Sequence, residues 1–303
     1  MADAQMPMGV SLTGIDTLSQ VLSGLLLVVL LFVIISVVEA TYKAFTAMWK
    51  DRVELFPDTI TSGSSVSTVI QDPLNPNAKT IYFSDNQRSG VEFTYATFLY
   101  IGSATFSNGD HSLYHIMHKG YNKSYPLMGP GIFSWGDSNK IRIFMNSFDS
   151  WNNYCDISNI PVDKWFHLVI TCKGNVVYIY INGNIKHQLS LNTSSNANNP
   201  SPPYQNYGNV YAFNSRKVTL SSSVTTSLGN DPQFNGTNSP QTQMVFNGAA
   251  TGMLSRTYYF SYAITYTEIQ YLMNMGPSKI MAGGVDMSIS PYLADTWWTN
   301  NRV

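Results

Sequence analysis

The chain has 303 residues, a formal net charge of −1 and only 12% charged residues. This length allows one large or two small domains. The near-neutral balance gives no basic face for nucleic acid, so we expect no nucleic-acid partner. The 19 Tyr and 15 Phe, set among many Asn, Gly and Ser, predict a mainly β body.

The first strong signal is an apolar run from Val21 to Val38, with no charged residue between Asp16 and Glu39. A run of this length can cross the ~30 Å hydrocarbon core of a bilayer. A cleaved signal peptide would have a basic start and a shorter apolar core, and a core helix would have a polar face. Neither feature is present, so we expect one transmembrane helix, with the lipid bilayer as a partner.

The flanks of this run predict its orientation. No Lys or Arg precedes Val21, whereas Lys43, Lys50 and Arg52 follow the run. Because basic residues favour the cytosolic side, we expect the C-terminal body there. The three glycosylation sequons, which begin at Asn122, Asn192 and Asn235, would be modified only if the body were lumenal, so they offer a test.

The helix is predicted to continue beyond the membrane as a stalk. Tyr42, Phe45, Trp49 and Val53 recur at three- and four-residue spacing, which places them on one helical face. Pro57 disfavours helix at the residue before it. This face either packs on the body or docks another chain, and Trp49 is a candidate partner contact.

The domain boundaries follow from composition. We expect an N-terminal segment at 1–16, the transmembrane helix and stalk at 17–56, a Ser/Thr/Pro-rich linker at 57–78, a β-sandwich at 79–276 and a C-terminal tail at 277–303. The sandwich is predicted to consist of many short strands, at 80–83, 92–101, 113–119, 140–146, 164–171, 176–181, 185–191, 210–213, 217–220 and 253–262.

Two local motifs support this assignment. The residues at 176–181 alternate strictly, and Asn182-Gly183 after them suits a type I′ hairpin turn. Thr265 and Glu268 form a capping-box pattern, which predicts one short helix ending near Gly276. Many strands with one late helix indicate a mainly β, two-sheet antiparallel jelly-roll sandwich, preceded by the long transmembrane helix. The Asn/Ser/Pro/Gly-rich stretch at 192–243 is either a set of surface loops or a contact surface.

The two cysteines, Cys155 and Cys172, bracket a predicted hairpin. They could face each other across two strands and form a disulfide, or they are two small buried hydrophobes.

Two segments together resemble the concanavalin A/laminin-G-like superfamily. Residues 160–189, IPVDKWFHLVITCKGNVVYIYINGNIKHQL, are similar to its Trp-x-His strand, Tyr-rich strand and Asn-Gly turn. Residues 252–276, GMLSRTYYFSYAITYTEIQYLMNMG, are similar to its last strand and terminal helix. The resemblance implies a concanavalin A-like sandwich.

A narrower resemblance is to a branch found in large nucleocytoplasmic DNA viruses, including chlorella-virus relatives. It rests on SDNQRSGVEFTYATFLYI at 84–101, NIPVDKWFHLVI at 159–170 and SPYLADTWW at 290–298, and spans about 70–298. It implies a structural virion protein: a minor capsid protein in the inner viral membrane, with its body on the capsid-facing side and other capsid proteins as partners. Tyr292, Trp297 and Trp298 in the tail are candidate partner contacts, buried either on the domain or in a neighbour.

The carboxylates argue against an enzyme. Glycoside hydrolases of this fold carry Glu-x-Asp-x-x-Glu or a close variant, because retaining hydrolysis needs two carboxyl groups ~5 Å apart. No segment here has two Glu within five residues. We therefore expect no enzymatic activity and no catalytic residues.

We also expect no metal and no cofactor. The Asp/Asn groups at 107–110, 136–139 and 229–231 are more simply turns than calcium sites. His115 and His118 are three apart on a predicted strand, which would point them to opposite faces and prevent a shared metal. We expect His167 to be a hydrogen-bonded core residue.

The alternative function is a membrane-displayed, lectin-like carbohydrate-binding module. Trp135 and Trp151 could stack on sugar rings, although core packing is the commoner role of such residues. Glycans are therefore a second class of partner that the sequence allows.

Overall fold

The computed structural model describes residues 13–50, 52–63, 66–84, 86–87, 90–193, 196–221 and 243–286. The chain divides into two compact units, residues 1–51 and 52–303. Each unit is described by itself.

The first unit is the helix α1, Thr13–Lys50. Its segment Ser19–Tyr42 has 24 apolar-rich residues and no buried side chain. At 1.5 Å per residue this segment is about 36 Å long, enough to cross a bilayer. By length and composition α1 is an apolar helix that suits a membrane span, and a signal sequence near an N-terminus would pass the same test.

The helix ends six residues earlier than its apolar spacing predicts. Residues Arg52–Phe56 form strand β1, which pairs antiparallel with β18, Gly252–Phe260. Leu55 and Phe56 are buried in the sandwich core. Pairing with β18 and burial of these side chains outweigh the helical spacing of Tyr42, Phe45, Trp49 and Val53. The expected linker at 57–78 also contributes two short strands, β2 (Ile60–Thr61) and β3 (Ser67–Val69).

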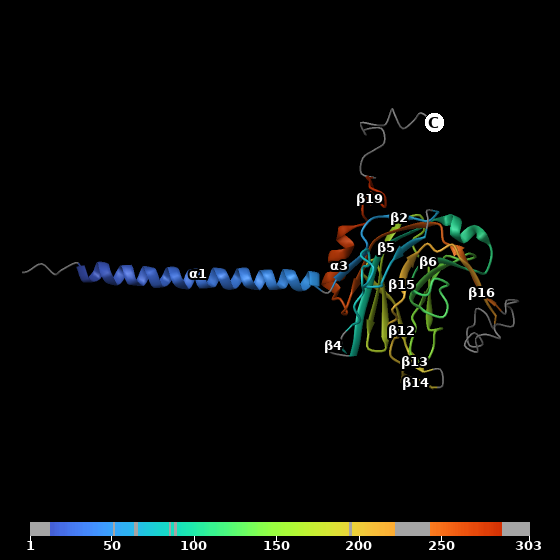
Figure 1. The fold of residues 1–303 in the computed structure, drawn as a ribbon, viewed down its shortest axis with the longest axis horizontal. Coiled ribbons are helices and arrows are strands. Elements are labelled where there is room, and N and C mark those ends of the chain that lie inside the picture. The colour runs from blue at the N-terminus through green and yellow to red at the C-terminus, as the bar shows by residue number, and fades with distance from the viewer. Residues whose placement is uncertain are drawn as a thin grey trace, which may run out of the picture. The chain divides into compact units, whose positions relative to one another are not determined.

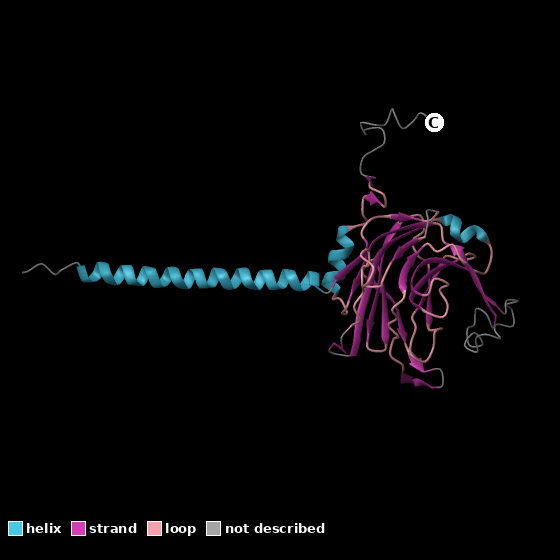
Figure 2. Ribbon diagram, viewed as in Figure 1, coloured by secondary structure: helices cyan, strands magenta, loops and turns pink. Residues whose placement is uncertain are grey.

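The second unit is a sandwich of two mostly antiparallel sheets (Figure 2). The first sheet has the order β1-β18-β5-β10-β11-β12, with β2 paired to β18 and β4 to β5. Beyond β1 and β18, its strands are β2 Ile60–Thr61, β4 Asn86–Gln87, β5 Gly90–Ile101, β10 Trp165–Lys173, β11 Val176–Ile181 and β12 Asn184–Ser190.

The second sheet has the order β16-β17-β6-β7-β8-β9, with β15 paired to β6 and β3 paired to β15. One of its pairings, β17 with β6, is parallel. Its strands are β3 Ser67–Val69, β6 Leu113–Gly120, β7 Met128–Trp135, β8 Lys140–Phe144, β9 Tyr154–Ser158, β15 Asn209–Ala212, β16 Lys217–Ser221 and β17 Gln243–Ala249.

Shorter elements complete the body (Figure 1). They are the hairpin β13 Asn192–Thr193 with β14 Asn196–Pro200, the 3₁₀-helix η1 Ser103–Asn108, the helix α3 Tyr266–Met275 and the hairpin β19 Ile280–Met281 with β20 Val285–Asp286. The predicted type I′ turn is confirmed, since Asn182 and Gly183 both have positive φ. Residues 80–83, predicted as a strand, are irregular.

The core consists of three layers of buried side chains, because each sheet buries side chains on both of its faces. The largest cluster lies between the sheets and takes alternate residues of each strand, such as Ile141 and Ile143 on β8. Phe144, from the opposite face of β8, joins a second cluster. The third cluster lies under α3, where Ile269 and Leu272 pack with residues of the first sheet.

The helix α3 begins with the predicted capping box. The Glu268 amide donates to Thr265 Oγ1 at 3.3 Å, and the Thr265 amide donates to Glu268 Oε2 at 2.6 Å. Each bond satisfies a backbone N–H that the helix itself cannot pair.

We expect Thr265→Ala to lower the free energy of unfolding by about 1 kcal/mol, because an N-cap acceptor is lost. Thr265→Ser keeps the hydroxyl and should cost far less. Urea unfolding of the full chain in detergent micelles would check this, and equal losses for Ala and Ser would contradict a capping role.

The two cysteines do not face each other in a hairpin. Cys155 lies on β9 in the second sheet and Cys172 on β10 in the first, because the chain crosses between sheets after β9. Both are free and buried in the cluster between the sheets. Burial raises the pKa of each thiol to about 12. They are small buried hydrophobes, as one of the two interpretations held.

Candidate functional site: a lysine pocket below exposed aromatics

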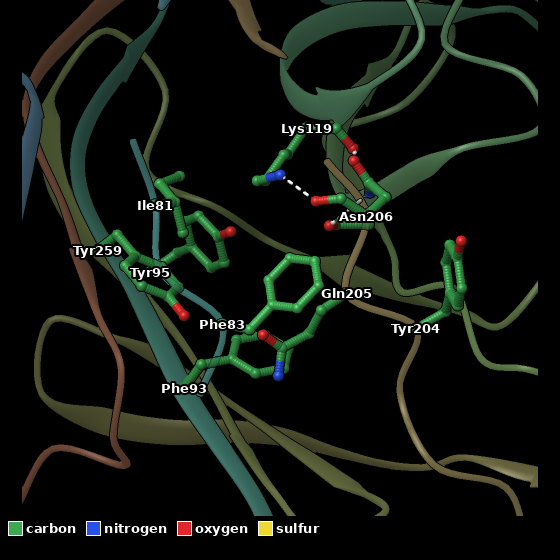
Figure 3. Close-up of a pocket in the computed structure, with 10 residues that line it drawn as sticks. Ile81, Phe83, Phe93, Tyr95, Lys119, Tyr204, Gln205, Asn206 and Tyr259 are labelled. Atoms are coloured by element: carbon green, nitrogen blue, oxygen red, sulfur yellow. Dashed lines mark hydrogen bonds between the residues drawn. The ribbon is translucent and has the colours of Figure 1, made fainter. Parts of the chain in front are cut away.

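One pocket of the sandwich combines a buried amine with aromatic walls (Figure 3). It encloses about 250 Å³ of empty space, part of it open to solvent. Its walls come from the segment before β4, from β5, β6, β7 and β18, and from the segment between β14 and β15. The lining residues are Ile81, Phe83, Phe93, Tyr95, Lys119, Gly129, Tyr204, Gln205, Asn206 and Tyr259.

Lys119 places a positive charge inside this pocket. The residue is only 4% exposed, and its Nζ donates to the carbonyl oxygens of Asn206 and of Gly208, the latter at 3.0 Å. In return, Asn206 Nδ2 donates to the Lys119 carbonyl at 3.1 Å. Within the described part of the chain no carboxylate pairs with Lys119. Burial lowers the pKa of this amine to about 8, so it is still mostly protonated at neutral pH.

The inner wall of the pocket is a set of packed rings. Tyr95 and Tyr259 have ring centroids 5.0 Å apart, and Phe93 meets Tyr95 edge-on at 6.0 Å. The Tyr259 hydroxyl donates to the Tyr82 carbonyl at 2.8 Å. Burial raises the pKa of both tyrosines, so both remain neutral hydrogen-bonding groups. These contacts fix the wall in place.

Aromatic side chains continue from the pocket onto the surface. We call Tyr82, Phe83, Phe148, Tyr204 and Tyr207 the aromatic rim. Phe83 and Tyr207 have ring centroids 4.4 Å apart, and Phe148 and Tyr204 are 5.1 Å apart. Phe83 and Tyr204 also line the pocket. Tyr82, Phe148 and Tyr207 are 74%, 70% and 81% exposed.

A side-chain-to-backbone and a backbone-to-backbone hydrogen bond hold the segments that carry the rim. Gln205 Oε1 accepts from the Ser84 amide at 3.0 Å, which links the segment after β14 to the segment before β4. The Phe148 amide donates to the Pro202 carbonyl at 3.2 Å. The rim therefore consists of side chains on fixed loops, although three of them expose most of their surface.

A second pocket is larger, and the lysine amine that lines it is already hydrogen-bonded. It holds about 740 Å³ of space, largely open, and is lined by residues of β1, β2 and β3 with Asn77, Lys79 and Ala282. The Lys79 Nζ donates to the carbonyls of Glu54 and Leu55 at 3.0 and 3.2 Å. This amine is exposed to solvent and bonded to backbone, so the pocket holds no buried charge.

The outer face of the second sheet carries an ion pair with a fully buried cation and a partly exposed carboxylate. Arg142 on β8 is 0% exposed, and its Nε and Nη2 donate to the two oxygens of Asp156 on β9 at 2.8 and 2.6 Å. Trp135 Nε1 also donates to Asp156, at 3.1 Å. The guanidinium lies 3.8 Å from the Tyr154 ring centroid and 4.8 Å from that of Trp135. Such a bidentate, stacked arrangement is a structural support of this face.

His115 and His118 point to the same side of β6, contrary to the prediction. A bulge between His115 and Met117 shifts the register, so the two rings meet with His115 Nε2 at 2.6 Å from His118 Nδ1. The Asn214 amide donates to His115 Nδ1 at 2.9 Å, and His118 Nε2 contacts the Tyr121 carbonyl at 2.7 Å. These partners assign one direction: His115 Nε2–H donates to His118 Nδ1, and His118 Nε2–H donates to Tyr121.

Both rings of this pair are therefore neutral, and each nitrogen has a partner. Burial lowers the pKa of His115 well below its usual value and that of His118 to about 4. No group of three or more His, Cys, Asp or Glu side chains that could hold a metal occurs among the described residues. The pair joins the turn after β6 to the segment after β15.

The other residues singled out from sequence are dispersed. Trp135 is fully buried against the Arg142 pair, so its ring offers no free face, and Trp151 is half-buried beside Tyr125 and Phe144. Trp49 lies in the last turn of α1. Tyr292, Trp297, Trp298 and the third sequon at Asn235 lie outside the described residues.

The Asp/Asn turns keep local roles. Asp137 accepts from His111 Nδ1 at 2.6 Å, and Asp110 accepts from Tyr114 at 3.0 Å and from Asn247 at 2.8 Å. Residues 229–231 lie outside the described part. His167 is buried against Phe98 as expected, but its Nδ1 has no partner among the described residues, and its bond to Asn182 Oδ1, at 2.9 Å, comes from its backbone amide.

Sequence reasoning did not single out the lysine pocket. Lys119 stands at the end of a predicted strand, where a lysine is normally solvated, and the carbonyls of Asn206 and Gly208 that bind it come from the stretch at 192–243, interpreted as surface loops or a contact surface. The one available signal was the density of Tyr and Phe in polar stretches at 80–83 and 204–207.

Comparison with known proteins agrees with this architecture. Residues 75–219 match the family model described as the concanavalin A-like lectin/glucanases superfamily. The match covers just under half of the chain, and over this part the two-sheet sandwich is similar to concanavalin A-like/laminin-G-like domains. No curated protein matches the chain.

Among solved structures, the receptor binding domain of botulinum neurotoxin D is 11% identical, with a TM-score of 0.40, over 74% of this chain and 52% of that one. The binding domain of botulinum neurotoxin DC in complex with SialylT is 16% identical, with a TM-score of 0.35, over 61% and 35%. This chain thus spans between about a third and a half of these structures.

Proposed function

We propose that this protein is a structural tether, a minor capsid protein that links an internal viral membrane to the capsid shell through a β-sandwich without catalytic activity. One observation carries the proposal: an exposed, membrane-length apolar helix at Ser19–Tyr42 belongs to the same chain as a concanavalin A-like domain. The viral assignment rests on the sequence resemblance over about 70–298.

The roles of the described carboxylates support a non-catalytic sandwich. Asp156 is paired with Arg142, Asp137 with His111, and Glu268 caps α3. A retaining glycosidase needs one carboxylate free to attack and another poised to donate a proton. Carboxylates engaged in this way hold the fold together instead.

Crosslinking in purified particles tests the tether. A lipid-borne photoprobe should label peptides from residues 19–42, and an amine-reactive crosslinker should join lysines of the sandwich to shell proteins. Absence of the chain from washed particles, or labelling of the sandwich by the lipid probe without any shell crosslink, would contradict the proposal.

The orientation gives a separate prediction. If the body lies on the cytosolic side, Asn122 should carry no glycan when the full chain is made in glycosylating cells, although its side chain is exposed. Mass spectrometry of the peptide reads this directly.

A matched control reverses the flanking charges. The variant Ala2→Lys, Gln5→Lys, Lys43→Gln, Lys50→Gln should turn the helix around, move the body to the lumen and add a glycan at Asn122. A glycan on the unaltered chain would overturn the proposed orientation.

Carbohydrate binding is the second candidate, because the matching family is described by its lectins and glucanases. Trp135 is covered, so the sugar platform expected from Trp135 and Trp151 would reduce to the half-buried Trp151. A glycan array probed with the full chain distinguishes carbohydrate binding from the structural tether. Saturable binding that Trp151→Ala removes would favour the lectin over the tether.

A further inference from the structure

We propose that the lysine pocket and the aromatic rim together form a docking site for a polypeptide of another protein, which inserts one acidic side chain toward Lys119. The inference deepens the proposed tether by naming the surface and the chemistry of its partner. It rests on that proposal only for the identity of the partner as a shell protein.

The Lys119 ammonium has no counter-charge among the described residues. An ammonium removed from water is costly unless an opposite charge or enough hydrogen bonds replace the water. Lys119 has three N–H donors, of which two reach the carbonyls of Asn206 and Gly208. No carboxylate of the described chain supplies a counter-charge. A carboxylate from outside would supply both the charge and the third acceptor.

The size of the pocket selects the kind of ligand. Its roughly 250 Å³ of empty space includes open solvent, and its interior has room for only about one water-sized group. One carboxylate oxygen at the tip of a side chain has about this size, whereas a whole small molecule does not. The Tyr95 ring, from β5, forms part of the pocket lining, so a short acidic side chain entering would lie between rings and the amine.

The rim explains why the occupant would be a polypeptide. Tyr82, Phe148 and Tyr207 expose most of their surface outside the pocket, where an inserted side chain could not cover them. Tyrosine and phenylalanine are enriched at protein interfaces, and tyrosine is among the residues that contribute most to binding there. A chain lying across the rim would bury these rings while its acidic residue enters.

The test uses the full chain in detergent micelles and two capped peptides, Ac-Ala-Glu-Ala-NH₂ and Ac-Ala-Gln-Ala-NH₂, which differ only in charge. Acetylation of Lys119 by acetic anhydride is followed by peptide mass spectrometry. We expect the Glu peptide to slow modification of Lys119 several-fold and the Gln peptide to have little effect. The exposed Lys186 should react equally with both and serves as the internal control.

A second measurement keeps the proposal falsifiable without labelling. The Glu peptide should raise the melting temperature of the unaltered chain but not of Lys119→Met, which keeps a similar length without charge. If Lys119→Met does not fold, the labelling comparison decides alone. Equal protection by both peptides, protection by neither, or protection by a neutral monosaccharide instead would overturn the proposal.

The partner is identified in the assembly by a carbodiimide. This reagent joins a carboxyl carbon to the Lys119 nitrogen as an amide and takes up the lost oxygen as a urea. We expect Lys119 to be linked to an Asp or Glu of another polypeptide in purified particles, and the link to weaken in Tyr207→Ala. If Lys119 were linked only to a second copy of this chain, the proposal that its partner is another protein would be contradicted. Absence of the chain from particles would defeat the tether while leaving the peptide result standing.

Discussion

Replacing Arg142 by Met is expected to lower the free energy of unfolding by about 2–3 kcal/mol, less than the ~3–5 kcal/mol typical of a fully buried pair, because the Asp156 side chain left without its cation is 21% exposed to water. The guanidinium is fully buried and makes two hydrogen bonds to Asp156. Its loss would leave a carboxylate in contact with Trp135 and without its cation. Urea unfolding of the full chain in detergent micelles, followed by tryptophan fluorescence, measures the change.

A double variant separates the charge from the packing. Asp156→Asn removes the negative charge and keeps an oxygen that can accept from Trp135 Nε1. We expect Arg142→Met with Asp156→Asn to be clearly more stable than Arg142→Met alone, because a neutral pair leaves no buried charge unpaired. Additive losses in the two single variants would show that this ion pair is not a coupled unit.

Acidification is expected to destabilise the sandwich between about pH 6.5 and pH 4. Burial lowers the pKa of His118 and of His167 to about 4, and lowers that of His115 as well. Below pH 6.5 the unfolded chain binds protons that the folded chain refuses, so stability falls as pH falls and is fully present above pH 6.5. His118 and His167 should each contribute about 3 kcal/mol to this loss.

The physical cause differs between these histidines. A proton added to His118 Nδ1 would face His115 Nε2–H across the 2.6 Å contact, and one added to His115 Nδ1 would face the Asn214 amide N–H at 2.9 Å. His167 lies against the Phe98 ring, 4.7 Å between centroids, and none of the described acidic residues favours its charged form. In all three, the charged ring would have to leave its site.

The control for this prediction is His167→Leu. This variant keeps an apolar residue against Phe98 and should flatten the decline of melting temperature between pH 7.5 and 4.5 by roughly the share of one histidine. His187, which is exposed on β12, is the matched control, since His187→Gln should leave the pH profile unchanged. If the melting temperature of the unaltered chain did not fall between pH 7.5 and 4.5, the conclusion that these buried histidines are neutral would be contradicted.

Sequence reasoning succeeded where one local signal decided the structure. The alternation at 176–181, the Asn182-Gly183 turn and the Thr265/Glu268 box each appear as predicted, because backbone geometry and caps are set by neighbouring residues. The apolar helix is likewise determined by composition. These features were sufficient to predict a two-sheet sandwich after a long N-terminal helix.

The misplaced features depend on partners far apart in the sequence. Strand β1 forms because β18, some 200 residues later, offers its edge. Strand β7 begins with Met-Gly-Pro-Gly, which indicates a loop, yet its later residues pair with β6 and β8. The bulge after His115 reverses the face of His118. A two-residue period cannot anticipate an inserted residue.

The lysine pocket shows the same limit for function. Lys119 becomes a buried charge only because Asn206 and Gly208, nearly ninety residues later, fold over it. The aromatic rim likewise joins Phe83 to Tyr207 across two segments without regular structure. Sequence patterns left sugar stacking open for Trp135 but favoured core packing, and packing is what the structure has, since Arg142 and its neighbours cover the ring.

The proposed tether depends on the apolar helix remaining attached to the sandwich. The most direct measurement is peptide mapping of the mature protein by mass spectrometry after alkaline extraction of membranes from purified particles. We predict that the chain stays in the membrane pellet and yields peptides covering residues 19–42. A mature chain that begins beyond residue 42 and is recovered in the soluble fraction would contradict the account.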